Sequence, residues 1–177
     1  MLCAPSTIHL AGAEIELVSQ VAREHRLRTA LEEYLEASTE RPDFVLIDCP
    51  PSLGLITTNA LNASDSVLIP VQCEYYALEG LSQLMSSVQA VKRRYNDRLE
   101  LEGVLLTMYD GRLNLTQQVV TEIKKYFPRK VFATVIPRTV RLSEAPSYGQ
   151  PILYYDKSNK GCIAYGALAD EILKKNR

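Results

Sequence analysis

Short apolar runs and longer helical patterns alternate along most of the chain. Each apolar run is bounded by turn residues, and its length suits a strand that is buried on both faces. We predict four such strands, at residues 44–47, 67–71, 104–108 and 131–136.

Between these runs, apolar residues recur at the spacing of one helix face, as Leu81, Leu84 and Val88 do. Strands that alternate with helices of this length are typical of βαβ units and a parallel sheet. We therefore predict an α/β fold of three layers, a mostly parallel sheet with helices on both faces, and a single domain over residues 1–177. The predicted helices cover residues 11–37, 78–95, 115–127 and 161–175.

The composition is that of an ordinary globular domain. Hydrophobic residues make up 46% of the 177 residues and charged residues 23%, which suffices for one domain with its own core. The net charge of -1, from 20 basic and 21 acidic residues, argues against a strongly charged partner over the whole surface but allows a local basic patch. No apolar run approaches the roughly 18 residues of a membrane span, so no membrane partner is expected.

Several common kinds of site find little support. Cys3, Cys49, Cys73 and Cys162 form no C-x-x-C pair, so the sequence indicates reduced thiols and neither a zinc site nor a disulfide framework. The chain has 2 histidines and contains no G-x-S-x-G or H-E-x-x-H motif. Generic hydrolase chemistry is therefore not favoured.

Ligands of parallel sheets bind beyond the carboxyl ends of the strands, so the chemistry is sought there. Asp48 directly follows the apolar run 44–47 and resembles a Walker B aspartate, which holds Mg²⁺ through a bound water. From the residues alone, the alternative is an aspartate that caps a turn between a strand and a helix.

The other strand ends carry groups suited to a nucleotide. Gln72 and Glu74 follow the second strand and either bind a ligand or cap the next helix. Met108 ends the third strand, and Pro137 and Arg138 follow the fourth. An apolar Met and a rigid Pro at neighbouring strand ends fit the two faces of a planar base, with simple loop packing as the alternative.

A phosphate-binding loop of the form G-x-x-x-x-G-K-[ST] is not found in these 177 residues. Gly161 and Gly166 have the glycine spacing, but Ala167 and Leu168 follow them. They also lie in a predicted helix and do not follow a strand, so we reject them as a phosphate loop.

Four ordered blocks, spread over nearly the whole chain, resemble the ParA/Soj family of chromosome- or plasmid-partitioning ATPases. They are LAGAEIEL at residues 10–17, DCPPSLGL at 48–55, PVQCEYYALEGL at 70–81 and VIPRTVRLSEAP at 135–146. The length and order of the blocks make this resemblance far more specific than any single motif above.

The resemblance implies a deviant Walker P-loop NTPase fold of the SIMIBI type that binds ATP and Mg²⁺. It implies an ATP-dependent homodimer, nonspecific DNA binding by that dimer, and a ParB-type centromere-binding partner that stimulates hydrolysis. It also implies a bacterial-type cytoplasmic, nucleoid-associated protein. Whether the cargo is a chromosome or a plasmid stays open.

The resemblance also implies roles for single residues. Asp48 corresponds to the catalytic Walker B aspartate that holds Mg²⁺ indirectly. The residues near the nucleotide are Met108, Pro137 and Arg138 around the adenine, and Gln72 and Glu74 in the loop close to the dimer partner. Arg112 and Arg141 match arginines that the family uses on DNA, where guanidinium groups bind phosphate regardless of sequence.

The chain departs from the family in its missing glycine- and lysine-rich phosphate loop. We therefore expect the C-terminal two-thirds of a ParA-type ATPase domain, lacking the N-terminal P-loop unit and inactive alone as an ATP hydrolase. The alternative is a noncatalytic regulatory module that binds DNA, ParB or ParA. A MinD-like membrane role would need a basic amphipathic C-terminal helix, which Asp170 and Glu171 oppose.

Overall fold

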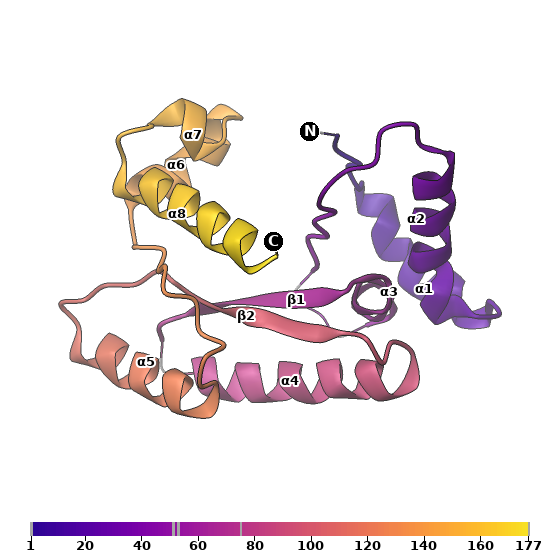
Figure 1. The fold of residues 1–177 in the computed structure, drawn as a ribbon, viewed down its shortest axis with the longest axis horizontal. Coiled ribbons are helices and arrows are strands. Elements are labelled where there is room, and N and C mark those ends of the chain that lie inside the picture. Colours follow the sequence, from indigo (N-terminus) through magenta and orange to yellow (C-terminus); the bar gives the residue numbers. More distant parts are fainter. Residues whose placement is uncertain (1, 51, 53, 75, 177) are drawn as a thin grey trace. The chain divides into compact units, whose positions relative to one another are not determined.

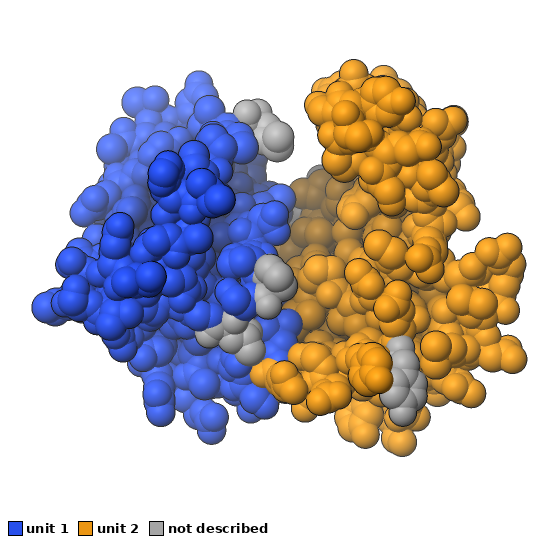
Figure 2. Space-filling model, turned by 180° about the vertical axis from the view of Figure 1, so that it is seen from behind, with its two compact units in different colours: residues 1–67, 84–100 blue, residues 68–83, 101–177 orange. Residues whose placement is uncertain are grey.

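The computed structural model describes residues 2–50, 52, 54–74 and 76–176. Pro51, Leu53 and Tyr75, which belong to the resembling blocks, lie outside the described residues. The chain divides into two compact units, coloured separately in Figure 2. Unit 1 comprises residues 1–67 and 84–100, and unit 2 comprises residues 68–83 and 101–177.

Within the described residues, helices and two strands follow one another (Figure 1). The strands are β1 (Ser66–Gln72) and β2 (Glu100–Thr107). The 3-10 helices are η1 (Ile8–Gly12), η2 (Leu17–Ser19), η3 (Arg23–His25) and η4 (Ala145–Tyr148). The α-helices are α1 (Ala13–Glu16), α2 (Arg26–Ala37), α3 (Leu55–Ala63), α4 (Ala77–Arg94), α5 (Asn114–Tyr126), α6 (Val140–Glu144), α7 (Ile152–Tyr155) and α8 (Lys160–Lys175).

The predicted helical region 11–37 of unit 1 is a succession of short helices that ends in the longer α2. The helical path breaks at Gln20, whose ψ of 143° is extended, and at Ala22, whose φ of 52° is left-handed. A side chain with a Cβ rarely adopts that left-handed conformation. Only the second half of the predicted helix is therefore regular.

The core of unit 1 gathers where α3, α4 and the residue just before β2 pack together. It is built from Leu61, Val88, Val91 and Leu99. Asn96, only 6% exposed, donates from Nδ2 to the carbonyl oxygens of Leu61 (3.0 Å) and Ser64 (2.7 Å). A buried side chain thus satisfies carbonyl groups at the end of α3, which such a terminus leaves without helical partners.

The predicted strand at residues 44–47 is not formed, and that prediction was wrong. Residues 44–50 carry no secondary structure, and Leu46 is 90% exposed. A strand exists through hydrogen bonds to a neighbouring strand, and no backbone hydrogen bond joins this segment to another described residue. Without such a partner, hydrophobicity alone does not make the segment a buried strand.

β1 and β2 pair in parallel. Cys73 N donates to Thr107 O (3.2 Å), and at the opposite end of the pair Glu100 N donates to Asp65 O (3.0 Å), so both chains run in the same direction. On the far side of β2, Phe132 N donates to Val104 O (3.0 Å). Residues 131–137 therefore extend the sheet, with parallel bridges at Val131 and Pro137 in place of the continuous strand that the sequence predicts.

A side chain of α8 explains why the ladder is interrupted between these bridges. The carboxylate of Glu171 accepts hydrogen bonds from the backbone N–H groups of Ala133 (2.8 Å) and Thr134 (2.9 Å). Those two donors are then not available to a neighbouring strand. Gly103 in β2 allows Phe132 to pack closely against the strand, because an added Cβ at Gly103 would lie 2.6 Å from the Phe132 ring.

Helices cover both faces of the unit 2 sheet, as predicted. Figure 1 shows α8 above the strands and α5 below them. On the α8 side, Leu105, Phe132, Ile136 and Leu168 form a buried cluster. Successive strand residues point to opposite faces, so Val104 and Leu106 face the side of α5. No helix within the described residues is long and apolar enough to cross a membrane.

Candidate functional site

The ends of β1 and β2 and the bridged segment 131–137 meet at one edge of the unit 2 sheet, where the sequence places its candidate nucleotide-binding residues. The end of β1 contacts the end of β2 through the bond from Cys73 N to Thr107 O (3.2 Å). Tyr109, just after β2, then contacts the bridged segment 131–137 and the residue after it. Its N donates to Ile136 O, and its O accepts from Arg138 N (both 3.1 Å). The chain thus leaves the sheet side by side at all three ends.

Met108 occupies an unusual backbone conformation at this edge. Its φ of 49° lies in the left-handed region, which costs a residue with a side chain roughly 1–2 kcal/mol. The side chain is 42% exposed, and the next residue, Tyr109, forms the bridge with Pro137. Strain of this kind is often retained at functional positions, and here it leaves an apolar side chain at the sheet edge.

Gln72 and Glu74 use backbone atoms to turn the chain from β1 into α4. Glu74 N donates to Gln72 O (2.8 Å), and Glu74 O accepts from Ala77 N (3.1 Å). Both residues are exposed. The helix start is thus held through the Glu74 carbonyl, and the two polar side chains face solvent.

Arg112 and Asp110 form a two-pronged ion pair after β2. Arg112 donates from Nε to Asp110 Oδ1 (2.9 Å) and from Nη2 to Oδ2 (2.7 Å), and its backbone N donates to Oδ1 (3.1 Å). These hydrogen bonds hold the pKa of the Asp110 carboxyl well below its usual range. The guanidinium is 89% exposed and the carboxylate 19%.

Arg141 shares its guanidinium among several neighbours. Nη1 lies 3.0 Å from Glu144 Oε2 and 3.4 Å from the Tyr155 hydroxyl, and Nε lies 3.7 Å from Asp156 Oδ2. The Tyr155 ring also lies under the guanidinium, 5.8 Å away, and stacks on Tyr148 with 5.1 Å between ring centres. The hydrogen bonds with Tyr155 and Glu144 raise the pKa of Arg141, so it stays charged.

Asp48 lies in unit 1, exposed, within the irregular segment 44–50. Among the described residues, no group of three or more His, Cys, Asp or Glu side chains is arranged to hold a metal ion. Asp48 therefore fits a magnesium ion as a single carboxylate, with water and phosphate oxygens as the natural remaining ligands.

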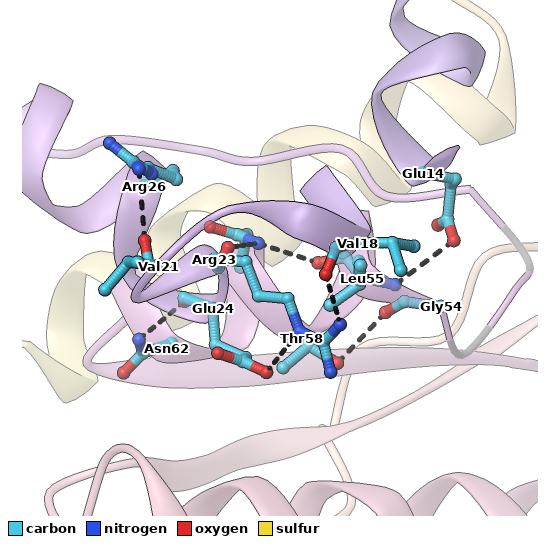
Figure 3. Close-up of polar contacts among 11 residues, drawn as sticks. Glu14, Val18, Val21, Arg23, Glu24, Arg26, Gly54, Leu55, Thr58 and Asn62 are labelled. Carbon is cyan, nitrogen blue, oxygen red and sulfur yellow. Dashed lines mark hydrogen bonds and ion pairs between the residues drawn. The ribbon is translucent and has the colours of Figure 1, made fainter. Parts of the chain in front are cut away.

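Two of the resembling blocks contact each other in unit 1, which the sequence did not reveal. Glu14 accepts hydrogen bonds from Leu55 N (3.3 Å) and Ile56 N (3.2 Å), so its carboxylate caps the start of α3 (Figure 3). Gly54 permits this approach, because an added Cβ would collide with the Glu14 carboxylate. A negative charge at a helix N-terminus is stabilising.

A polar network next to this cap holds the loop before α2 on α3. Asn62 Nδ2 donates to Glu24 O (2.7 Å), and Arg23 bonds the Glu24 carboxylate (3.0 Å) and the Val18 carbonyl (2.9 Å), as Figure 3 shows. The bond from Arg23 lowers the pKa of Glu24. The residues point at one another and at backbone atoms, so this network holds the loop in place and is not a candidate ligand site.

Comparison with known proteins identifies the family. The profile of the AAA domain family matches residues 2–101. Sporulation initiation inhibitor protein Soj of Bacillus subtilis is 61% identical over 168 residues, which cover 95% of this chain and 65% of Soj. The chain belongs to the ParA/Soj family of AAA domain proteins. Chromosome partitioning protein ParA of Myxococcus xanthus is 55% identical over 172 residues, or 97% of this chain and 59% of that protein.

Solved structures place the ParA/Soj chain among the P-loop NTPases. Cobyrinic acid a,c-diamide synthase from Mycobacterium smegmatis, solved with a bound ATP analog and magnesium, superposes with a TM-score of 0.80 at 35% identity. The match covers 96% of this chain and 61% of that one. The chain thus spans about 60–65% of the length of the proteins it matches.

Proposed function

We propose that this chain is part of a ParA/Soj-type partition ATPase. It supplies the sheet edge that contacts the adenine base, the aspartate that holds magnesium through a water, and the arginines that contact DNA. Such an enzyme dimerises with ATP, binds DNA nonspecifically and hydrolyses ATP under stimulation by a ParB-type partner. The observation that carries the proposal is that the ends of β1 and β2 meet the bridged segment 131–137 at one edge of unit 2. The similarity of this chain to Soj and to a chromosome partitioning protein supports the proposal.

The edge has the chemistry that an adenine base needs. The exposed Met108 side chain and the ring of Pro137, which pairs with the residue after Met108, offer apolar surface to the faces of a planar ring. Arg138, Gln72 and Glu74 are exposed at the same strand ends and offer donors and acceptors to polar atoms of the nucleotide or of a dimer partner.

Asp48 is proposed as the aspartate that orients a water on magnesium. Bound Mg²⁺–ATP supplies the phosphoryl group that is transferred to water. The contribution of Asp48 is a fixed negative charge and a hydrogen-bond acceptor for a metal-bound water. An exposed carboxylate suits that role, because a metal-bound water can reach it.

Arg112 and Arg141 are proposed to contact DNA phosphates. Their side chains are 89% and 53% exposed, and both occur in unit 2. A dimer would present each of them twice. Guanidinium groups on phosphates give affinity without sequence preference and with strong salt dependence.

The test uses a chimera that joins this chain to the part of B. subtilis Soj that the match does not cover. Arg112→Ala with Arg141→Ala should abolish DNA retention and spare ATP-dependent dimerisation, measured by gel shift and by light scattering. Arg26→Ala with Arg28→Ala, which removes one exposed and one half-buried arginine of α2, is the matched control. Unchanged DNA binding in the first double variant, or an equal loss in the control, would refute the assignment.

A noncatalytic DNA- or ParB-binding module is the second candidate, favoured by the exposure of Arg112 and Arg141 in unit 2. Titration with a fluorescent ATP analogue, with and without Mg²⁺, separates the two. We expect the chimera to bind the nucleotide and the chain alone to bind it weakly. Tight Mg²⁺-dependent binding by the chain alone would contradict the need for a separate phosphate loop, and nucleotide-independent DNA binding in both forms would support the module.

A further inference from the structure

Arg112 is the more exposed of the two arginines proposed to contact DNA, and it is already paired with a carboxylate of the protein itself. The Asp110 carboxylate takes the Nε and Nη2 donors of Arg112, at 2.9 and 2.7 Å. This is the two-pronged geometry with which arginine also binds phosphate. A DNA phosphate that approaches the same side of the guanidinium therefore meets an occupied pair of donors.

The two partners are not held equally. Asp110 is 19% exposed and accepts an additional bond from the Arg112 backbone N (3.1 Å), whereas the Arg112 side chain is 89% exposed. The carboxylate is thus fixed by the turn, and the guanidinium is the partner that is free to leave. Exchange of the carboxylate for a phosphate needs only a rotation of the arginine side chain.

We propose that Asp110 is a built-in competitor for the DNA phosphate at Arg112 and thereby limits the affinity of the chain for DNA. The proposal rests on the DNA-binding role proposed above for Arg112. Nonspecific binding to DNA depends on uncompensated positive charge, and Asp110 balances this charge when the pair is closed. Arg141 has two carboxylates and a hydroxyl around it, so Arg112, which one carboxylate holds, gives the sharper test.

The experiment measures binding of a fluorescent DNA duplex of mixed sequence to the full chain and to the chimera, by anisotropy over a range of salt concentrations. Variants are Asp110→Asn, Asp110→Ala, Arg112→Ala and the double variant Asp110→Asn with Arg112→Ala. Asp170→Asn is the matched control, because Asp170 is an exposed residue of α8 and the substitution makes the same change in net charge.

We expect both Asp110 variants to bind DNA about two- to five-fold more tightly than the Asp170 variant, the range that an exposed ion pair allows. Arg112→Ala should weaken binding and lower the salt slope by about one. In that background, Asp110→Asn should have no more effect than Asp170→Asn. Circular dichroism confirms that each variant is folded.

Each contrary outcome has a distinct meaning. Equal affinities of the Asp110→Asn and Asp170→Asn variants would overturn the proposal, because they would show a general charge effect. Weaker binding by Asp110→Ala would also overturn it, since Asp110 would then orient Arg112 toward DNA and not compete with DNA. If Arg112→Ala leaves binding unchanged, or no form binds DNA, the DNA-binding function itself fails.

Discussion

The contact of Glu171 with residues 133 and 134 is expected to be a main attachment of α8 to the sheet of unit 2. Its carboxylate accepts two backbone hydrogen bonds, at 2.8 and 2.9 Å. Glu171→Gln keeps the shape of the side chain, removes its charge and turns an amide NH₂ toward one of the two donors. One of the N–H groups then loses its acceptor.

The size of the effect follows from the partners. Hydrogen bonds to a charged group contribute about 1.5–3 kcal/mol each, but Ala133 is exposed and its N–H can turn to water. We therefore expect Glu171→Gln to lower the free energy of unfolding by about 1–2 kcal/mol. For a chain of this size, each kcal/mol lowers Tm by about 2–4 °C.

The loss should depend on pH. Burial raises the pKa of Glu171, but the bonds from Ala133 and Thr134 outweigh it, so the pKa lies below the usual 4.5. A carboxyl with a lowered folded pKa contributes stability above its unfolded pKa and loses it as the pH falls through the folded value. The difference between the native chain and the variant is thus full at neutral pH and shrinks below about pH 4.5.

Urea unfolding at neutral and acidic pH, followed by circular dichroism, measures this difference. Amide hydrogen exchange of Ala133 and Thr134 reports on the same contact locally and should accelerate in the variant. Glu122→Gln is the control, because the ion pair that Glu122 makes with Lys125 is long, at 3.9 Å. Equal stability of the native and Glu171→Gln chains at neutral pH, or a deficit that persists on acidification, would refute the reasoning.

Two further predictions concern packing and thiol reactivity. Gly103→Ala should destabilise unit 2 by about 1–3 kcal/mol, because the new Cβ would meet Phe132, whereas Gly80→Ala in α4 has open space and should be neutral or stabilising in thermal unfolding. A stable Gly103→Ala chain would contradict the close approach. Cys73 is buried, which raises the pKa of its thiol, so iodoacetamide at mildly alkaline pH should modify it far more slowly than the exposed Cys3; similar rates would contradict its burial.

The sequence predicts well those elements whose apolar residues have a clear period. The long helices α4, α5 and α8 and the strands β1 and β2 lie within a few residues of the predicted bounds. The sequence indicates a helix after Asp48 but not its bounds, because the buried residues of α3 include Thr57, Asn59 and Asn62, which do not form an apolar stripe. Periodicity detects burial of apolar groups, and a helix buried through polar side chains escapes it.

The strand predicted at residues 44–47 failed for the opposite reason. Its composition suits a buried strand, but a strand is a property of two chain segments and not of one. Side-chain contacts are likewise hard to predict from sequence when their partners lie far apart in the chain. Asp110 stands two residues before Arg112, so their pairing is open to inspection of the sequence, whereas Glu171 bonds a backbone N–H 38 residues away.

The candidate site was predicted in part. Its place at the strand ends follows from the rule for parallel sheets, and the backbone contacts of Tyr109 confirm that neighbouring ends meet. The roles of the single residues came from family resemblance and stay predictions. The left-handed backbone of Met108 had no signal in the sequence, because residues with a side chain adopt that conformation only where the surrounding fold requires it.

The cap that Glu14 provides for α3 bears on the order in which unit 1 folds. A helix of 9 residues is too short to persist alone in water, and its N-terminal donors are satisfied by a carboxylate 41 residues earlier in the chain. We infer that α3 is not an early, autonomous helix. It becomes stable only when the N-terminal segment has folded back and Glu14 has bound the first turn of the helix.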